Sequence, residues 1–410
     1  MTNQVSGPSV VSLFAGAGGT DVGLERAGWR TALATDVDAA CMATLNAAKQ
    51  SSILVEGLED VTYLQGAALM LADVRDLSGE DLKPGDAPDG WRPDLLVGGP
   101  PCQPWSSAGL QKGLQDERGQ LIDHFVRMAD ELKPHFVLFE NVRGLVTAIG
   151  RTGKPGEVLT DIKKSFENIG YATAFATLNA ADYGAAQRRV RLYMLASCDH
   201  ELPSFPEATH ARGEDLDLFS VRKSWVDLGS FIDDLPAPAM NDIVRPSQTR
   251  EAELSALRPG TGLRTAGRTE NNRPGGHWGY RQDSFVADLD LPSRTIRAAT
   301  TPDWVRLPDG THRRLTWREC AALQGFPYEW PFQGPVTSKF RQIGNAVQAD
   351  MAEVLGRSIL ASLQGGQLER KPRSSSLPAE FGRRIKYTTA EHRTNGSHRV
   401  RVRASVTSHE

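Results

Sequence analysis

The sequence predicts an α/β protein, with a doubly wound, mostly parallel sheet and a smaller, loop-rich second domain. Short apolar runs alternate with longer amphipathic stretches from residue 10 to about residue 196. A glycine-rich turn follows the first apolar run, and from about residue 200 to 290 Pro, Gly, Arg and Asp become frequent. Strands that alternate with helices are typical of parallel βαβ units, and the change in composition indicates a separate domain.

Local patterns predict the strands and helices between residues 10 and 196. Val10–Phe14 is apolar and ends in a glycine-rich turn, which favours a buried strand. Gly28 stands where a helix over residues 20–27 would end. Further strands are predicted at residues 31–35, 94–97 and 136–139, and further helices at residues 120–132 and 156–169.

The second part is interrupted by strong turn signals at residues 258–262 and 272–276. Thr316 and Glu319 have the spacing of a helix capping box, so a short helix is expected up to Leu323. The amphipathic pattern of residues 347–363 predicts a last helix. Residues 366–410 are rich in Ser, Arg and Gly and are expected to be largely disordered.

Composition excludes several classes of protein. The chain has 410 residues, of which 40% are hydrophobic and 24% charged, as in globular proteins. No apolar run approaches the roughly 20 residues of a membrane span, and the N-terminus lacks the pattern of a signal peptide. The 4 cysteines contain no Cys-x-x-Cys pair, which indicates a reducing compartment. We therefore expect a cytoplasmic protein without a membrane partner or a bound metal.

The net charge of −3 conceals an asymmetry along the chain. Residues 370–410 hold ten Lys and Arg and three Glu, a net charge of +7, so the preceding residues carry −10. Local clusters of Lys and Arg, rather than overall charge, determine binding to a phosphate backbone. The basic tail is therefore either a sequence-independent nucleic-acid contact or a solvated segment without a role.

The first candidate site is the turn from Phe14 to Gly19, between the first strand and helix. Gly16 and Gly18 allow the backbone to approach a ligand closely at the carboxyl end of the sheet. Asp36 follows the next strand and can accept hydrogen bonds from ribose hydroxyls, although it can also be a helix N-cap. No Gly-Lys-Ser/Thr follows, so a nucleoside is favoured over a triphosphate.

The second candidate site is Cys102, in the run Gly98-Gly99-Pro100-Pro101-Cys102-Gln103-Pro104-Trp105. The glycines permit a sharp exit from the strand, and the prolines stiffen the approach to the thiol. A lone cysteine is usually a small buried hydrophobe, but this loop favours a displayed nucleophile. The other three cysteines are expected to be small buried hydrophobic residues.

The third and fourth candidates are Glu140 and a pair of arginines. Glu140 directly follows a buried strand and suits acid catalysis on a ring nitrogen, although an N-cap or an ion pair is the simpler alternative. Arg189 and Arg191 are predicted to share one face of a strand, because side chains alternate. They suit a phosphate or a base edge, and the alternative is a solvated basic face.

These motifs, in this order and together with Gln342–Val347, resemble those of the bacterial cytosine-5 DNA methyltransferases. The resemblance spans about residues 10–196 and 290–360. It implies a Rossmann-like methyltransferase domain over residues 1–198 that resumes at 291–365, with a target-recognition domain at 199–290. It also implies methylation of C5 of a flipped-out cytosine in duplex DNA, within a restriction–modification or related defence system.

The resemblance also implies roles for individual residues. Cys102 would be the nucleophile, Glu140 would engage cytosine N3, and Arg189 and Arg191 would bind the cytosine and its surroundings. S-adenosylmethionine, which becomes S-adenosylhomocysteine, would be held by a set in which Asp36 contacts the ribose and Asp73 the adenine. That set comprises Phe14, Gly16, Gly18, Asp36, Val37, Asp73, Val74, Pro100 and Asn345. Arginines expected to read guanine are Arg264, Arg268, Arg273 and Arg281.

Three positions depart from the family pattern. Asp36 replaces the usual Glu, Val37 replaces a bulky residue that stacks on adenine, and Gln348 replaces a proline. Each departure weakens an expected contact with the cofactor, but none removes a catalytic group.

Other functions fit the motifs less well. A tRNA cytosine-5 methyltransferase would share the chemistry, but the loop-rich region and Pro-Cys-Gln-Pro-Trp favour DNA. A silent DNA-binding module has no need of Cys102 and Glu140, and an NAD-dependent dehydrogenase leaves the Cys102 loop unexplained. We expect a monomer that acts on double-stranded DNA, with a cognate restriction or defence nuclease as a further partner.

Overall fold

The computed structural model describes residues 7–85, 87–101, 121–150, 152–213, 221–263, 281–369 and 372–386. The chain forms two compact units. Unit 1 comprises Met1–Leu71, Asn179–Arg189 and Phe205–Leu360, and unit 2 comprises Ala72–Leu178, Val190–Ser204 and Ala361–Glu410. Among the described residues, no helix combines the length and apolar character needed to cross a membrane.

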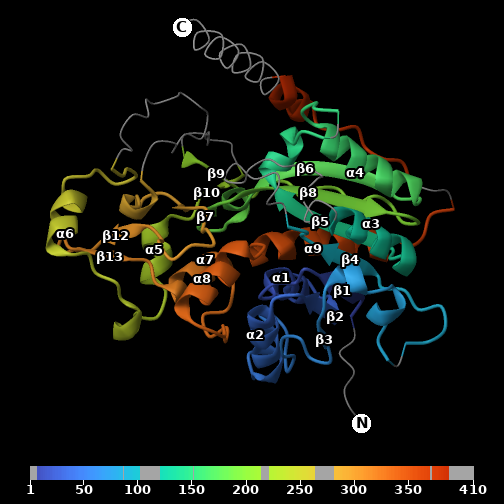
Figure 1. The fold of residues 1–410 in the computed structure, drawn as a ribbon, viewed down its shortest axis with the longest axis horizontal. Helices are drawn as coiled ribbons and strands as arrows, with labels where there is room; N and C mark the ends of the chain where they lie inside the picture. Colours follow the sequence, from blue (N-terminus) through green and yellow to red (C-terminus); the bar gives the residue numbers. More distant parts are fainter. Residues whose placement is uncertain are drawn as a thin grey trace, which may run out of the picture. The chain divides into compact units, whose positions relative to one another are not determined.

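The main sheet has the strand order β3-β2-β1-β4-β5-β8-β6 (Figure 1). Its strands are β1 (Ser9–Leu13), β2 (Arg30–Asp36), β3 (Ala68–Leu71), β4 (Leu95–Gly98), β5 (Phe136–Val142), β6 (Ala172–Asn179) and β8 (Val190–Ser197). In unit 1 β1 pairs with β2 and β2 with β3 in parallel, and in unit 2 β4 pairs with β5 in parallel. β8 runs antiparallel to β5. The doubly wound α/β sheet expected from the sequence is confirmed.

The described helices follow the predicted positions in several places. They are α1 (Gly19–Arg26), α2 (Ala39–Gln50), α3 (Leu121–Leu132), α4 (Glu157–Asn168), α5 (Leu228–Asp233), α6 (Gln248–Ser255), α7 (Trp317–Leu323), α8 (Val336–Asn345) and α9 (Ala349–Gln364). The capping box is present: the Thr316 hydroxyl accepts from the Glu319 amide, and the Glu319 carboxylate accepts from the Thr316 amide. The sequence analysis did not assign α2 or α8.

Glycine brings α1 into contact with the first residue of α9 and the residues just before it. A Cβ at Gly19 would lie 2.2 Å from the carbonyl oxygen of Val347, and one at Gly23 would lie 2.0 Å from that of Ala349. No larger side chain fits such approaches, because real Cβ contacts of this length do not occur. The two glycines therefore let residues far apart in the sequence form one packed layer of unit 1.

From residue 205 the loop-rich region belongs to unit 1, and its described elements are short. The paired strands of unit 1 outside the main sheet are β9 (His210–Ala211) with β10 (Lys223–Ser224), β7 (Gln187–Arg188) with β11 (Ser293–Arg294), and β12 (Trp304–Arg306) with β13 (His312–Arg314). Leu254, Val286 and Trp304 form a small apolar cluster of their own. His312 also bonds to Glu251, with 2.6 Å between its Nδ1 and the carboxylate. The packing of this region therefore continues beyond the expected boundary at residue 290.

The tail differs from the expectation of disorder over residues 366–410. Residues 372–386 are described, they include a helix over residues 379–386, and Phe381 within it is fully buried. The low apolar content of the segment concealed this element, since Phe381 is its one fully buried apolar side chain among residues 372–386. For residues 387–410 the expectation lies outside the described part of the chain.

Candidate active site

The glycine turn of unit 1 has the backbone that the motif predicts. Phe14, Gly16 and Gly18 have positive φ values of 55°, 58° and 91°. A Cβ built at Gly16 would meet no atom within 4 Å, so the turn is open on that side. On the inner side, Trp330 Nε1 donates to the carbonyl oxygen of Ala17 at 3.0 Å. The turn is thus supported from within and free to meet a ligand at Gly16.

Asp36 lies at the end of β2 and holds this turn in place. Its carboxylate accepts hydrogen bonds from the backbone amides of Gly16 and Asp38, both at 2.8 Å. Burial raises the pKa of Asp36 above its ordinary value, although the two amides oppose the shift. The N-cap of α2 is Asp38, whose side chain accepts from Ala40, so the alternative N-cap role for Asp36 is wrong.

The remaining expected cofactor residues lie in both units. In unit 1, Val37 follows Asp36 and is 67% exposed, and Asn345 is exposed at the end of α8. In unit 2, Asp73 caps the 3-10 helix η1 (Val74–Asp76) and forms a bidentate ion pair with Arg75, which lowers the pKa of its carboxyl. Val74 is buried. The carboxylate of Asp73 therefore has a cationic partner of its own.

The exit from β4 lies against the end of β5 in unit 2. The buried Asn141 side chain donates to the carbonyl oxygen of Pro100 at 3.1 Å. A Cβ at Gly99 would lie 3.2 Å from Glu140 Oε2, so glycine permits a close approach to this carboxylate. Cys102 lies outside the described residues. The preceding segment, residues 98–101, lies beside Glu140. The Asn141 hydrogen bond fixes it there, and the absence of a Cβ at Gly99 permits the close approach.

Glu140 is shielded and paired with a cation. Its Oε1 lies 3.2 Å from Arg191 Nε, and the two side chains are 14% and 16% exposed. The pair follows from strand register, because β5 and β8 run antiparallel and place Arg191 opposite Val142, two residues beyond Glu140. Of the interpretations left open for Glu140, the ion pair is present. It places the carboxylate in a fixed orientation near the solvent.

Arg189 does not share a strand face with Arg191, so that expectation is wrong. Arg189 lies between β7 and β8 and belongs to unit 1, whereas Arg191 belongs to unit 2. The Arg189 side chain is 3% exposed and donates to the carbonyl oxygens of Ile296, Gly344 and Ala346 at 3.2, 3.3 and 2.7 Å. The strand is interrupted at Arg189, so the alternation of side chains does not apply there. Its guanidinium supports the backbone of the segment that carries Asn345.

Two buried glutamines complete this network, and the sequence analysis did not single them out. Gln187 Nε2 donates to the carbonyl oxygen of Leu323 and to Gln324 Oε1, both at 2.9 Å, and its Oε1 accepts from the Ile296 amide. Gln324 Nε2 in turn donates to the carbonyl oxygen of Ile343. Both glutamines could have been found from the sequence, because each stands beside motif residues. A buried amide side chain bonds to several partners at once, so such a residue is suited to join separate segments.

Gln348, which stands where the family pattern has proline, also has a structural task. Its Oε1 accepts from the Met351 amide at 2.8 Å, and its Nε2 donates to Asp350. It therefore caps the N-terminus of α9, where a proline would supply no side-chain acceptor. The substitution preserves the helix start, and its expected cost to cofactor binding is not evident from these contacts.

The described cysteines have the environments of structural thiols. Cys41 and Cys320 are buried, and burial raises their thiol pKa values well above the ordinary value. Burial likewise raises the pKa of Cys198 to about 11. All three are therefore poor nucleophiles at neutral pH, as expected from the sequence.

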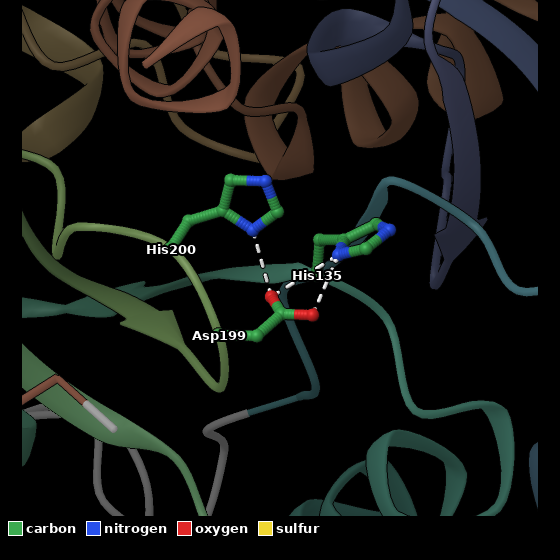
Figure 2. Close-up of side chains that lie close together, drawn as sticks. All are labelled: His135, Asp199 and His200. Carbon is green, nitrogen blue, oxygen red and sulfur yellow. Dashed lines mark hydrogen bonds and ion pairs between the residues drawn. The ribbon is translucent and has the colours of Figure 1, made fainter. Parts of the chain in front are cut away.

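A separate polar cluster lies in unit 2, at the start of β5 and the end of β8. Asp199 lies within 3.0 Å of His135 Nδ1 and 2.7 Å of His200 Nδ1 (Figure 2). These three side chains have the donor types of a metal site. However, Arg92 Nη2 lies 2.6 Å from Asp199 and 2.9 Å from His135, so a guanidinium supplies the cation among these groups.

The comparisons with known proteins identify the family of the chain. The family described as C-5 cytosine-specific DNA methylase matches residues 9–361, and the chain belongs to this family. The chain is accordingly a DNA cytosine-5 methyltransferase, and methylation in this family depends on S-adenosylmethionine. The match covers the glycine turn, Glu140, both arginines and Asn345 in one continuous range.

Relatives of known activity extend over most of the chain. The type II methyltransferase M.Eco47II of Escherichia coli is 31% identical and covers 86% of this chain and 78% of its own. M.SacI of Streptomyces achromogenes is 30% identical and covers 91% and 97%. The structure of the Entamoeba histolytica methyltransferase EhMeth matches with a TM-score of 0.60 at 13% identity, over 87% of this chain and 99% of its own, which supports the fold alone.

Proposed function

We propose that the chain methylates C5 of a flipped-out cytosine within one specific duplex DNA sequence, with Cys102 as the covalent nucleophile. The family supplies the reaction class, and the geometry around Glu140 supports the assignment of roles. The observation that carries it is the pairing of Glu140 with Arg191 beside the exit from β4. A shielded carboxylate next to the backbone that leads to a thiol suits attack on a heteroaromatic ring.

The residues of unit 1 fit the adenosyl part of S-adenosylmethionine. The turn is open at Gly16, the exposed Val37 offers an apolar surface, and Asp36 retains lone pairs for ribose hydroxyls beyond its two amide contacts. When bound, this cofactor supplies an electrophilic methyl group on its sulfonium. Asp73 suits the adenine amino group, although its bond to Arg75 means that only its remaining lone pairs are free for this contact.

The chemistry assigned to Cys102 and Glu140 follows from the cytosine ring. C5 is a weak carbon nucleophile until a new bond from the Cys102 sulfur to C6 removes the aromaticity. Glu140 hydrogen-bonds or donates a proton at N3, which stabilises the negative charge that develops there. After C5 is methylated, loss of its proton to a base lets the C5–C6 double bond re-form and expels the Cys102 thiolate. A base inside a duplex is inaccessible to these groups, so the cytosine must flip out.

Arg191 and Arg189 have different roles in this proposal. Arg191 orients Glu140 through their ion pair, and its remaining donors are assigned to the flipped base. Arg189 acts as a positioning residue for residues 344–346 rather than as a contact to the cytosine, because its donors meet backbone carbonyls. This assignment replaces the shared role expected from the motif.

Sequence recognition is assigned to the loop-rich region of unit 1. We place its extent at about residues 205–315, because Leu254 and Glu251 pack with Trp304 and His312. Arg281 is described and pairs with Asp283 at 3.0 Å, whereas Arg264, Arg268 and Arg273 lie outside the described residues. We further propose that the protein acts as a monomer and, since its relatives are type II methyltransferases, that it has a cognate restriction or defence nuclease as a partner.

Bisulfite sequencing of plasmid DNA tests the reaction, the nucleophile and the recognition sequence together. Cells expressing the wild type are expected to show protected cytosines in one repeated context, and Cys102→Ser is expected to abolish them. Cys198→Ser is the matched control, because the Cys198 thiol bonds to the backbone oxygens of Pro134 and His135 and burial raises its pKa to about 11. Protection that persists in Cys102→Ser contradicts the assignment of the nucleophile. Protection of tRNA rather than DNA would transfer the proposal to the RNA substrate.

A further inference from the structure

The chain continues beyond the family match at residue 361 and beyond the end of α9 at Gln364. This C-terminal extension, residues 365–386, is attached to unit 2 at several points. The Leu368 amide donates to the carbonyl oxygen of Asp199 at 2.7 Å, and Gln367 forms an isolated antiparallel bridge with His200. The first attachment therefore lies at the cluster of Asp199 and the two histidines in Figure 2.

The second attachment covers β6, the last strand in the order of the main sheet. The Thr173 amide donates to Ser374 Oγ at 3.0 Å, and the Ser375 amide donates to the carbonyl oxygen of Thr173 at 2.8 Å. Thr177 donates to Glu380 at 2.6 Å. Uncovered edge strands invite association with other chains, and the extension protects this one.

The third attachment is helix 379–386, the short helix coloured red in Figure 1. Phe381 is fully buried, and Ile385, one turn later, contacts Gly156 so closely that a Cβ there would lie 2.5 Å from Ile385 Cδ1. Residues four apart share one helix face, so this face is fixed against unit 2. Arg383 and Lys386 are exposed on the rest of the helix surface.

The attached helix places one cation beside another. Arg143 is the first residue of the 3-10 helix η5 (Arg143–Thr147) and is three residues beyond Glu140. The helix packs beside η5, because a Cβ at Gly156 would contact both Ile385 Cδ1 and, at 3.5 Å, the carbonyl oxygen of Val146 in η5. Arg143 is exposed, and partial desolvation together with the charge of Arg384 lowers its pKa. Glu380 is the acidic residue of the helix and is engaged with Thr177. Among the described residues, neither arginine forms an ion pair with a carboxylate.

We propose that Arg143 and the basic face of helix 379–386 form a phosphate-binding surface for the backbone of the substrate DNA. Residues 370–386 hold six Lys and Arg and one Glu, and an anion between Arg143 and Arg384 relieves their repulsion. Duplex DNA offers about one negative charge per 1.7 Å of its axis. The contact is sequence-independent, and it is additional to base reading by the loop-rich region.

The test measures binding of a fluorescent duplex without the recognition sequence, over a range of salt from about 50 to about 200 mM. Arg384→Gln is expected to weaken binding about fivefold and to reduce the slope of log K against log salt by about one. Lys133→Gln is the matched control, because it removes one charge from unit 2 just before the start of β5, whereas Arg143 follows its end. It is expected to bind as the wild type does.

Three results would overturn the proposal. Arg384→Gln with wild-type affinity and salt slope would exclude a phosphate contact by the helix, and a loss confined to Arg399→Gln, Arg401→Gln and Arg403→Gln would assign it to the tail instead. Equal weakening by Lys133→Gln would reduce the effect to overall charge. Bisulfite protection is a separate readout, so failure here leaves the methylation assignment intact.

Discussion

Arg189 and Arg191 are two residues apart in one motif, yet they lie in regions of opposite character. The Arg189 region is a buried network in which an arginine and two glutamines bond to backbone carbonyls. The Arg191 region is a charged pair with Glu140 near solvent. A basic motif can therefore divide its residues between a buried backbone support and an accessible ion pair, to which we assign the chemistry. The two arginines differ in the partner of the guanidinium group, which is a set of backbone carbonyls for Arg189 and a carboxylate for Arg191.

The largest expected effect tests the Arg191 region. Glu140→Gln keeps the size of the side chain but removes the carboxyl group. The negative charge that develops on the cytosine then has no acid at N3 to stabilise it. We expect the methyl-transfer rate in single-turnover assays to fall about 100- to 10,000-fold. The free energy of unfolding is expected to change by about 1 kcal/mol or less, as for a partly exposed ion pair. A variant that retains the wild-type rate would remove Glu140 from the mechanism.

The second prediction tests the Arg189 region, where a substitution is expected to lower stability more than rate. Arg189→Met keeps most of the side-chain volume but leaves three buried carbonyls without this donor. We expect the free energy of unfolding to fall by about 3 kcal/mol, measured by urea denaturation. Arg191→Met is the comparison, with a smaller loss of stability and a larger loss of rate. If both variants lose stability equally, the division between scaffold and chemistry is wrong.

The smallest effect concerns Glu25, a buried carboxylate for which the described part of the chain supplies no cation of the kind that Glu140 has. Burial raises the pKa of Glu25 from 4.5 to about 7, although the Leu64 and Thr31 amides donate to it. Because the folded state binds the proton more tightly, this stabilisation is complete below about pH 4.5 and is lost as pH rises through 7. We expect the unfolding free energy to fall by an amount on the order of 1–3 kcal/mol between pH 5 and 8.

Glu25→Gln is expected to flatten this pH dependence, as measured by denaturation at a series of pH values. Glu59→Gln, at an exposed position, is the control and should retain the wild-type profile. A Glu25→Gln profile that still declines as the wild type does would assign the titration to another group.

Elements with strong local signals could be predicted from the sequence. The strand at residues 10–14 became β1 within one residue, because apolar side chains and a glycine turn mark both of its ends. The capping box of α7 was likewise set by Thr316 and Glu319 alone. What could not be predicted depends on distant partners. Nothing near Arg189 indicates that residues 296 and 344–346 supply its carbonyls, and nothing near Phe381 indicates the surface that buries it.

The contact between α1 and the segment before α9 has a consequence for how the protein is made. Gly19 and Gly23 meet Val347 and Ala349, which a ribosome adds more than 300 residues later. The glycine turn therefore lacks this packing partner until residues 347–349 have been synthesised. Contacts of such separation form slowly, because a long loop must close first. A nascent chain of this protein would complete the packing of its glycine turn only after these distant residues have left the ribosome.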